Sequence, residues 1–320
     1  MIKKLEDLNW SSKWVSHLGC IKGCLDFLGI DASDAWVYGG TGHAFIMNVH
    51  DVVCPSGPTA WNTQRMLELL ENLGCKIDTV CAHKSQEDFT EKQKNAWELV
   101  KLSINAGYPC YGWELAIPEY YVVYGYDENH YYFKGPAMTP ETKPRLWQEL
   151  GETDIGMIEM YAVKPAQAPD DTTAVKEALT FALEYAQSPD KWVFPKYKAG
   201  LAAYDNWIKA FETQTAEGFG TAYNAEVWSE CRSLAVGFLK EAKGRLADAN
   251  LDPVFDEAIS HYEIVASELG KVKELFPFLA LKPEHIKDAA RREKAVAALK
   301  TARDAEAKGL ELLKRITDKQ

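Results

Sequence analysis

Residues 108–136 read YPCYGWELAIPEYYVVYGYDENHYYFKGP and decide the fold of the N-terminal half. The stretch divides into YPCYGWEL (108–115), EYYVVYGYD (119–127) and HYYFKGP (130–136), separated at Pro118 and at Glu128-Asn129. Tyrosine and valine are dense here, which is typical of strands that pack in a sheet. We therefore predict three short strands, followed by a fourth strand, GMIEMYAV, at 156–163.

Helix and strand signals are mixed upstream of this stretch. Residues 17–29 (HLGCIKGCLDFLG) predict a helix, because Ile21, Leu25 and Leu28 share one face and Gly29 can end it. The stretch GGTGHAFIMNV (39–49) predicts a glycine-rich turn that continues as an apolar strand, and CPSGP (54–58) predicts a loop. The remaining expected elements are a helix at 59–73, a strand at 75–82 and a helix at 86–106.

The composition changes after the segment KPAQAPDDTT (164–173), which reads as a linker. Beyond it, apolar residues recur at helical spacing, and Pro and Gly breaks indicate about five helices, the last at 284–318. We therefore predict an α+β protein with two parts. An α/β domain spans 1–165 and an all-helical domain spans 172–320.

Charge and composition exclude several classes of protein. The 320 residues carry a formal net charge of -11, so phosphate backbones are repelled and we expect no nucleic-acid partner. No apolar run approaches bilayer length and the N-terminus has no signal-peptide pattern, so we expect no membrane association and a cytoplasmic location. The seven cysteines are odd in number, which together with that location predicts reduced thiols.

The early cysteine helix and the late tyrosine-rich hairpin together resemble a known layout. Papain-like peptidases of the bacteriocin-processing C39 type have a Cys at the start of a helix and, far downstream, a strand of the form His-x-Val-Val-x-x-Gly-Tyr-Asp. Here that strand is EYYVVYGYD (119–127). The pair His17-Leu-Gly-Cys20 and YGGTGHAF (38–45) resembles, more narrowly, the N-terminal family of butirosin-biosynthesis protein H, whose members are similar to C39 domains and often carry a helical C-terminal part.

The chain departs from this pattern at the catalytic positions. Counted back from Gly125, the catalytic His of a C39-like domain falls at Glu119, and the Asp that orients it falls at Gly135. A thiol needs a base or a positive neighbour to ionise near neutral pH, whereas a carboxylate raises its pKa. The sequence therefore predicts that ordinary papain-type proteolysis is absent.

Two residues remain candidates for covalent chemistry. Cys20 is expected near a helix N-terminus, where the helix dipole stabilises a thiolate; the alternative is a thiol buried in the core. His43 follows the glycine-rich turn and could act as the base for Cys20; the alternative is a histidine hydrogen-bonded to the backbone. Gly42 belongs to the same turn, in which small residues let backbone amides approach a ligand.

A binding pocket is expected between the cysteine helix, the His43 turn and the hairpin. Glu114 and Glu119 flank Pro118 among aromatic side chains, and two carboxylates there can bind a cation or an amine, or act as acid and base. The alternative is a pair of solvated edge charges. The residues expected to line this pocket are His17, Gly42, Trp113, Glu114, Tyr120 and Tyr121.

Two functions follow from this reading. The first is a papain-like module without peptidase activity that binds a small-molecule or peptide-like ligand between the two halves. The second is an amide or thioester hydrolase or an acyltransferase, with Cys20 as nucleophile and His43 as base; the resemblance implies acyl transfer from an acyl carrier protein. Cysteine and histidine spacings match no standard zinc pattern, so we expect neither metal nor cofactor.

Overall fold

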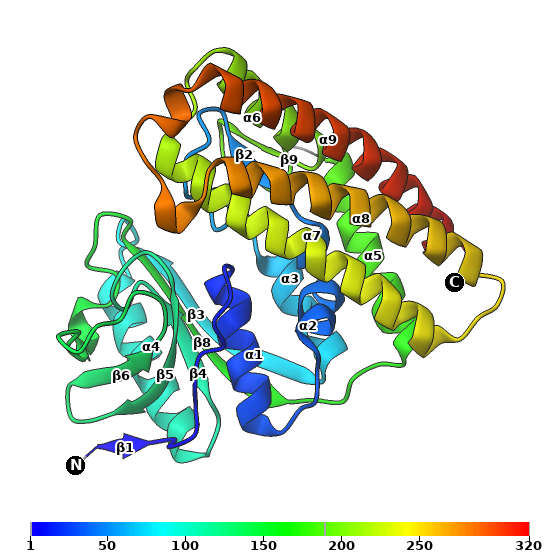
Figure 1. Ribbon diagram of the computed structural model, residues 1–320. Coiled ribbons are helices and arrows are strands. Elements are labelled where there is room, and N and C mark those ends of the chain that lie inside the picture. Colours follow the sequence, from blue (N-terminus) through cyan, green and yellow to red (C-terminus); the bar gives the residue numbers. More distant parts are fainter. Residues whose placement is uncertain (1, 189, 320) are drawn as a thin grey trace. The chain divides into compact units, whose positions relative to one another are not determined.

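The computed structural model describes residues 2–188 and 190–319. It is a mixed α+β structure, 54% helical and 15% strand. The chain forms two compact units (Figure 1). The first unit comprises residues up to Ser33 together with Leu73–Ala168, and the second comprises Asp34–Asn72 and everything from Pro169 onward. The second boundary lies close to the expected one, but residues 34–72 belong with the helical part, not with the sheet.

The first unit is built on an antiparallel sheet with the strand order β3-β8-β4-β5-β6-β7, and β1 pairs with β5. The strands expected at 75–82, 108–136 and 156–163 are all present. Their bounds are β1 Lys3–Lys4, β3 Cys75–His83, β4 Cys110–Trp113, β5 Tyr120–Tyr126, β6 His130–Lys134, β7 Arg145–Leu146 and β8 Met157–Pro165.

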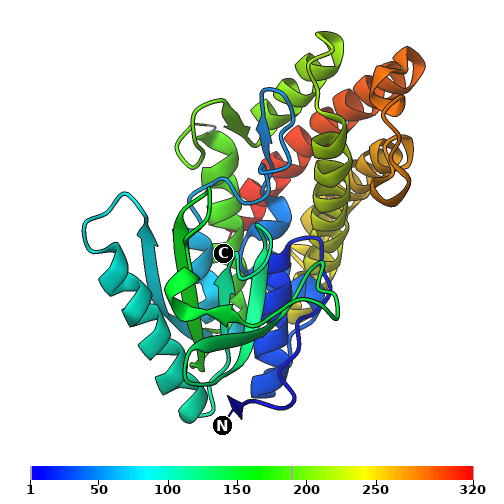
Figure 2. The ribbon, with the colours of Figure 1, turned by 90° about the vertical axis from the view of Figure 1, so that its left-hand side faces the viewer.

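Two helices cover opposite faces of this sheet (Figure 2). α4 (Phe89–Asn105) packs on one face, where it buries a core that includes Trp97, Tyr121 and Val123. α1 (Ser16–Leu28) packs on the other face, mainly against β5. Because side chains alternate along a strand, the neighbours of the α4-side residues point toward α1. The two faces therefore have separate side-chain environments.

The helices of the first unit end where the sequence predicts. Gly29 follows α1 in the left-handed region with φ 70°, and Gly107 follows α4 with φ 83°. Glycine adopts this conformation without the steric cost that a Cβ brings, so it ends helices efficiently. The expected helices at 17–29 and 86–106 are therefore confirmed.

The second unit consists mainly of helices. Among the described residues after Pro169 there are five long helices, as expected: α5 Asp171–Gln187, α6 Leu201–Glu212, α7 Gly218–Leu246, α8 Asp252–Leu275 and α9 Ala289–Thr317. The segment 34–72 adds α2 Asp34–Gly40, a 3₁₀ turn η1 His43–Phe45, β2 Asn48–His50, α3 Gln64–Glu68 and a 3₁₀ turn η2 Leu69–Leu73. β2 pairs with a short strand, β9 (Tyr197–Ala199), and the turns η3 Trp147–Glu149, η4 Phe278–Ala280 and η5 His285–Lys287 complete the described elements.

Two predictions for residues 39–73 are wrong in detail. The strand expected to continue from the glycine turn to residue 49 is confined to Asn48–His50, because 43–45 form a 3₁₀ turn. The helix expected at 59–73 begins only at Gln64, whose backbone N–H donates to the Asn62 side chain (3.0 Å), and it tightens into a 3₁₀ turn after Glu68. Propensity alone does not locate such boundaries.

A buried ion pair holds the core of the second unit together. Arg232 on α7 is completely buried and binds Glu306 on α9 through two hydrogen bonds of 2.9 and 2.6 Å. Its remaining Nη1 donates to the carbonyl oxygens of Ala44 and Ile46 at 2.9 and 2.8 Å. Tyr204 on α6 also donates to the Glu306 carboxylate. Arg232 therefore fixes the turn that contains His43 against α7 and α9.

Candidate functional site

The candidate site of the first unit begins at the N-terminus of α1. Ser16 is the first residue of that helix and is 3% exposed. Its Oγ donates to the Glu119 carboxylate and accepts a hydrogen bond from the Tyr120 backbone N–H at 3.0 Å. A hydroxyl can donate once and accept twice, so both contacts are compatible. The sequence interpretation missed Ser16 and placed the nucleophile at Cys20, four residues further along the same helix.

The loop between β4 and β5 presents Glu119 to this serine. The Glu114 N–H donates to the Glu119 carbonyl oxygen at 2.8 Å, and Glu114 adopts a left-handed backbone conformation with φ 57°. This conformation is uncommon for a residue with a side chain and clusters at functional sites. The Glu114 side chain turns away to accept a hydrogen bond from Thr153 Oγ1 at 2.7 Å. The two glutamates that were expected to act together thus have different partners.

A polar aromatic cluster lies on the α1 face of the sheet. It consists of the His17 side chain and three tyrosines from neighbouring strands, Tyr111, Tyr120 and Tyr161. We call these four residues the tyrosine cluster. His17 stacks on Tyr120 with ring centroids 3.9 Å apart, and its Nε2 lies 3.1 Å from the Tyr111 hydroxyl. The Tyr111 ring in turn stacks on Tyr161 at 4.8 Å. Trp113, the next α1-side residue of β4, packs edge-on against Tyr120 at 4.9 Å.

Glu159 on β8 lies at the end of the tyrosine cluster, beside two of its hydroxyl groups. It is partly exposed and accepts hydrogen bonds from the hydroxyls of Tyr120 and Tyr161, the latter at 3.0 Å. Among the residues that the structure describes, it has no ion-pair partner. Burial raises the pKa of Glu159, and the two tyrosine hydrogen bonds oppose that rise. The pKa values of Tyr120 and Tyr161 are raised well above 10, by burial first and then by the Glu159 charge, so both remain neutral donors.

Tyr121 does not belong to this cluster. It belongs to the core on the α4 side, with Phe133 and Trp97, whereas its neighbour Tyr120 points toward α1. Its hydroxyl accepts from the Ile117 N–H and donates to the Pro136 carbonyl, both at 3.2 Å. The expectation that Tyr120 and Tyr121 line one pocket overlooks the alternation of side chains along β5. The same alternation in β4 and β8 is the signal that could have found Tyr111, Tyr161 and Glu159.

Cys20 lies one helical turn below Ser16 and has no exposed surface. Burial raises its pKa well above 9.0, and the nearby Glu119 charge raises it further. The pKa of Cys24, one turn on, is raised in the same way, by burial first and then by Cys20. Both side chains are therefore neutral thiols at pH 7. Because only a thiolate is an effective nucleophile, neither cysteine is nucleophilic in this state.

His43 belongs to the second unit, not to the unit that contains Cys20. It is 1% exposed, its Nδ1 lies 3.7 Å from the Cys231 thiol, and its ring contacts Tyr38 and Trp61. Burial lowers its pKa to about 3, and the positive charge of Arg232 contributes to that shift. His43 is therefore a neutral imidazole at physiological pH.

The glycine-rich turn before His43 is closely packed. A Cβ at Gly39 would lie 1.9 Å from the Phe238 ring. Gly42 has φ 74°, and a Cβ there would lie 2.7 Å from the Phe181 ring. Contacts between 3.4 and 4 Å are ordinary, so neither position has room for a side chain. Packing inside the second unit accounts for these small residues, including Gly42, which was expected to contact a ligand.

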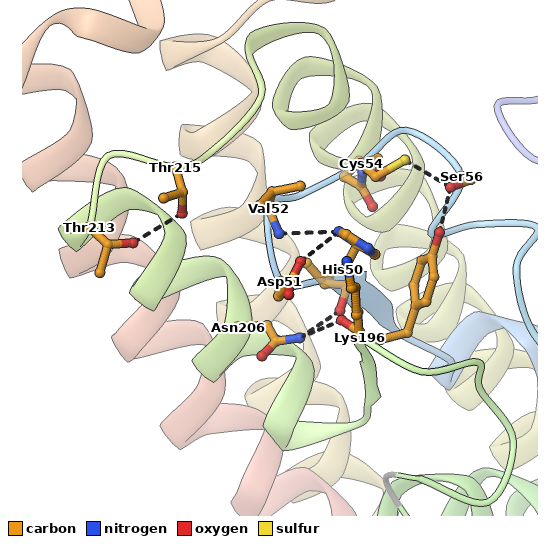
Figure 3. A network of polar contacts seen from close by, with 12 residues as sticks. His50, Asp51, Val52, Cys54, Ser56, Lys196, Asn206, Thr213 and Thr215 are labelled. Atoms are coloured by element: carbon orange, nitrogen blue, oxygen red, sulfur yellow. Dashed lines mark hydrogen bonds and ion pairs between the residues drawn. The ribbon is translucent and has the colours of Figure 1, made fainter.

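A second polar network fastens the loop after β2 to β9 (Figure 3). His50 Nδ1 lies 2.9 Å from the Asp51 carboxylate, and the His50 ring packs edge-on against Tyr197. The Ser56 hydroxyl lies 2.9 Å from the Cys54 thiol and 2.6 Å from the Tyr197 hydroxyl. Asn206 on α6 donates to backbone carbonyls on both segments, at 2.9 and 3.5 Å. This network contains the partly exposed cysteine of the second unit, Cys54.

Two classes of feature are missing from the described residues. Neither range, 2–188 or 190–319, holds a group of three or more His, Cys, Asp or Glu side chains arranged to bind a metal ion. Within those ranges, no helix has the length and apolar content that crossing a bilayer requires. A comparison of the chain with models of known protein families found no match, and a comparison with curated proteins found none either.

Proposed function

We propose that the first unit is a papain-like module that binds a small-molecule or peptide-like ligand and does not act as a peptidase. One observation carries the proposal: the helix start holds a serine hydrogen-bonded to a carboxylate, Ser16 with Glu119, instead of a thiol with an imidazole. The thiol of Cys20 is buried beneath it and stays protonated. Thiol peptidases need an ionised sulfur that the substrate can reach.

The chemistry of the site favours a ligand with a positively charged amine. Glu119 and Glu159 lie at the two ends of Tyr120, one beside its backbone N–H through Ser16 and the other at its hydroxyl. Both glutamates are partly exposed residues, whereas Tyr120 between them is buried. A carboxylate that forms a charge-assisted hydrogen bond to an ammonium group contributes more than a neutral pair does.

Acyl transfer through Cys20 with His43 as base remains the alternative. It requires both side chains to become accessible, although Cys20 has no exposed surface and His43 is 1% exposed. It also requires an imidazole that takes up a proton near neutral pH, whereas the pKa of His43 is lowered to about 3. These observations favour binding without covalent chemistry.

Calorimetric titration with N-acetylated lysyl dipeptides, and with N-acetylated norleucyl dipeptides that lack only the side-chain amine, tests the proposal. We expect the lysyl peptides to bind more tightly, and Glu119→Gln to weaken that binding about tenfold or more, as loss of a charged hydrogen bond does. The matched control is Glu128→Gln, which removes the same charge from the exposed turn between β5 and β6. Equal binding of both peptide series, or undiminished binding by Glu119→Gln, would contradict the proposal.

A further inference from the structure

A groove runs between the C-terminal end of α8 and the N-terminal end of α9 in the second unit. Its volume is about 810 Å³. The Arg291 guanidinium donates to the Leu275 carbonyl oxygen, so the two helix ends are level with one another there. Leu275, Ala290, Ala297 and Ala298 supply its apolar lining. Small side chains on α9 leave this part of the helix pair open to a further helix.

The two walls of the groove have opposite charge. The α8 wall carries Glu268, Lys271 and Glu274, and Lys271 pairs with Glu268 at 2.6 Å. The α9 wall carries Lys294 and Arg291, and Arg291 lies 3.7 Å from the Asp288 carboxylate. Glu274 and Lys294 are both exposed and have no ion pair within the described ranges. One negative charge on α8 and one positive charge on α9 are thus left without partners.

The groove-lining residues of α9, and partly or fully exposed residues of α8, follow the spacing of a helix–helix seam. On α9 the lining residues Ala290, Lys294, Ala297 and Thr301 are separated by four, three and four positions. On α8 the same steps connect Ile264, Glu268, Lys271 and Leu275, and Ile264 is 41% exposed. Alternating steps of three and four place residues on the face that packs in a helix bundle. The α9 seam is therefore exposed, and the α8 seam is covered in part by its own unit.

We propose that this groove is the interface with a second copy of the chain. A two-fold axis parallel to α8 and α9 places α8 of one copy opposite α9 of the other, with the helices antiparallel. A rotation about this axis does not change the position of a residue along the helix direction. Glu274 of each copy therefore lies opposite the region around Lys294 of the partner copy. The product is a four-helix arrangement whose acidic and basic walls complement each other, as a symmetric interface requires. This inference is independent of the proposed ligand site.

Light scattering coupled to size-exclusion chromatography tests the interface. The full chain is expected to approach the mass of two chains at concentrations up to about 100 µM, a range that covers weak specific interfaces. Glu274→Lys and Lys294→Glu each place like charges opposite one another and should weaken association about tenfold or more. An equimolar mixture of the two variants should restore the dimer, because the introduced charges then face opposite ones.

Lys314→Glu is the matched control, since it makes the same charge change in the last turn of α9, outside the groove. It should leave the dimer intact, and circular dichroism should show that all three variants keep the helical content of the wild type. A wild-type chain that stays monomeric throughout the range overturns the proposal. A dimer that both groove variants leave unchanged, or that their mixture fails to restore, overturns it as well.

Discussion

The two units hold their carboxylates in different ways. In the second unit, Arg232 and Glu306 are almost completely buried, and they satisfy each other with two hydrogen bonds. In the first unit, Glu159 is partly exposed and receives its hydrogen bonds from neutral tyrosine hydroxyls. The hydrogen-bonding groups of the buried pair are occupied by each other, whereas Glu159 has no cation as a partner among the described residues. Charge therefore stabilises the packing of the second unit, whereas under the proposed function the first unit uses charge to bind a ligand.

The largest expected effect follows from breaking the buried pair. Arg232→Met leaves the Glu306 charge buried without a cation and removes the donor to Ala44 and Ile46. We expect the free energy of unfolding to fall by about 3–5 kcal/mol, the usual cost of removing one partner of a buried pair. Urea denaturation followed by circular dichroism measures the change.

Arg315→Met is the control for this substitution. Arg315 pairs with Glu257 at 3.4 Å, but both side chains are 55% exposed. Exposed pairs contribute about 0–1 kcal/mol, so this variant should be close to the wild type. If Arg232→Met costs no more than Arg315→Met, the buried pair does not hold the core of the second unit together as described.

A smaller effect concerns the pH dependence of stability through His43. Its folded pKa of about 3 lies below the ordinary value of 6.5, so below pH 6.5 the unfolded chain binds a proton that the folded chain does not. The stability of the folded state is therefore not reduced by His43 above pH 6.5, and it falls through this residue as the pH drops toward 3. Between pH 7 and pH 5 the wild type should lose about 2 kcal/mol more than His43→Gln.

The matched histidine control is His285→Gln, at a partly exposed position of the second unit. Urea titrations at a series of pH values measure the free energy of unfolding of both variants and of the wild type. A wild-type curve that runs parallel to that of His43→Gln would show that His43 is not held neutral by burial.

The smallest effect is one of labelling rates, without a change in stability. Of the seven free cysteines, Cys81 is exposed, Cys54 is partly exposed and the other five are buried. Iodoacetamide should therefore modify Cys81 first and Cys54 next, while Cys20 reacts only after unfolding or local opening. Burial raises the pKa of Cys81, so its labelling should still be accelerating as the pH passes 9. Site mapping by mass spectrometry measures the order, and early labelling of Cys20 would favour the acyl-transfer alternative.

Strong periodicity made much of the fold predictable. The tyrosine- and valine-rich stretch gave three strands, and glycines at positions 29 and 107 end their helices as expected. Residues 34–72 were assigned to the wrong unit because their partners are distant in sequence: Gly39 packs on Phe238, and the carbonyl of Ala44 binds Arg232. Local patterns do not report contacts across nearly two hundred residues.

The site was predictable only in part. Glu119, His17 and Tyr120 were singled out, and the structure brings all three to the start of α1 or its neighbouring strand. Ser16 was missed because a buried serine has no distinctive pattern, and Glu159 was missed because strand pairing decides which residues it meets. Position on the sheet, not residue type, selects the members of such a cluster.

The route of the chain between the units has a consequence for synthesis on the ribosome. The chain crosses between them after Ser33, Asn72 and Ala168, so residues 34–72 emerge long before the helices that bury them. During that interval their apolar side chains have no native partner, while the sheet around β5 can already assemble once residue 168 has left the exit tunnel. Domains generally fold as units during translation, and exposed apolar segments are prone to aggregate. We expect nascent chains that stop before α7 to need a chaperone and full-length chains to release it.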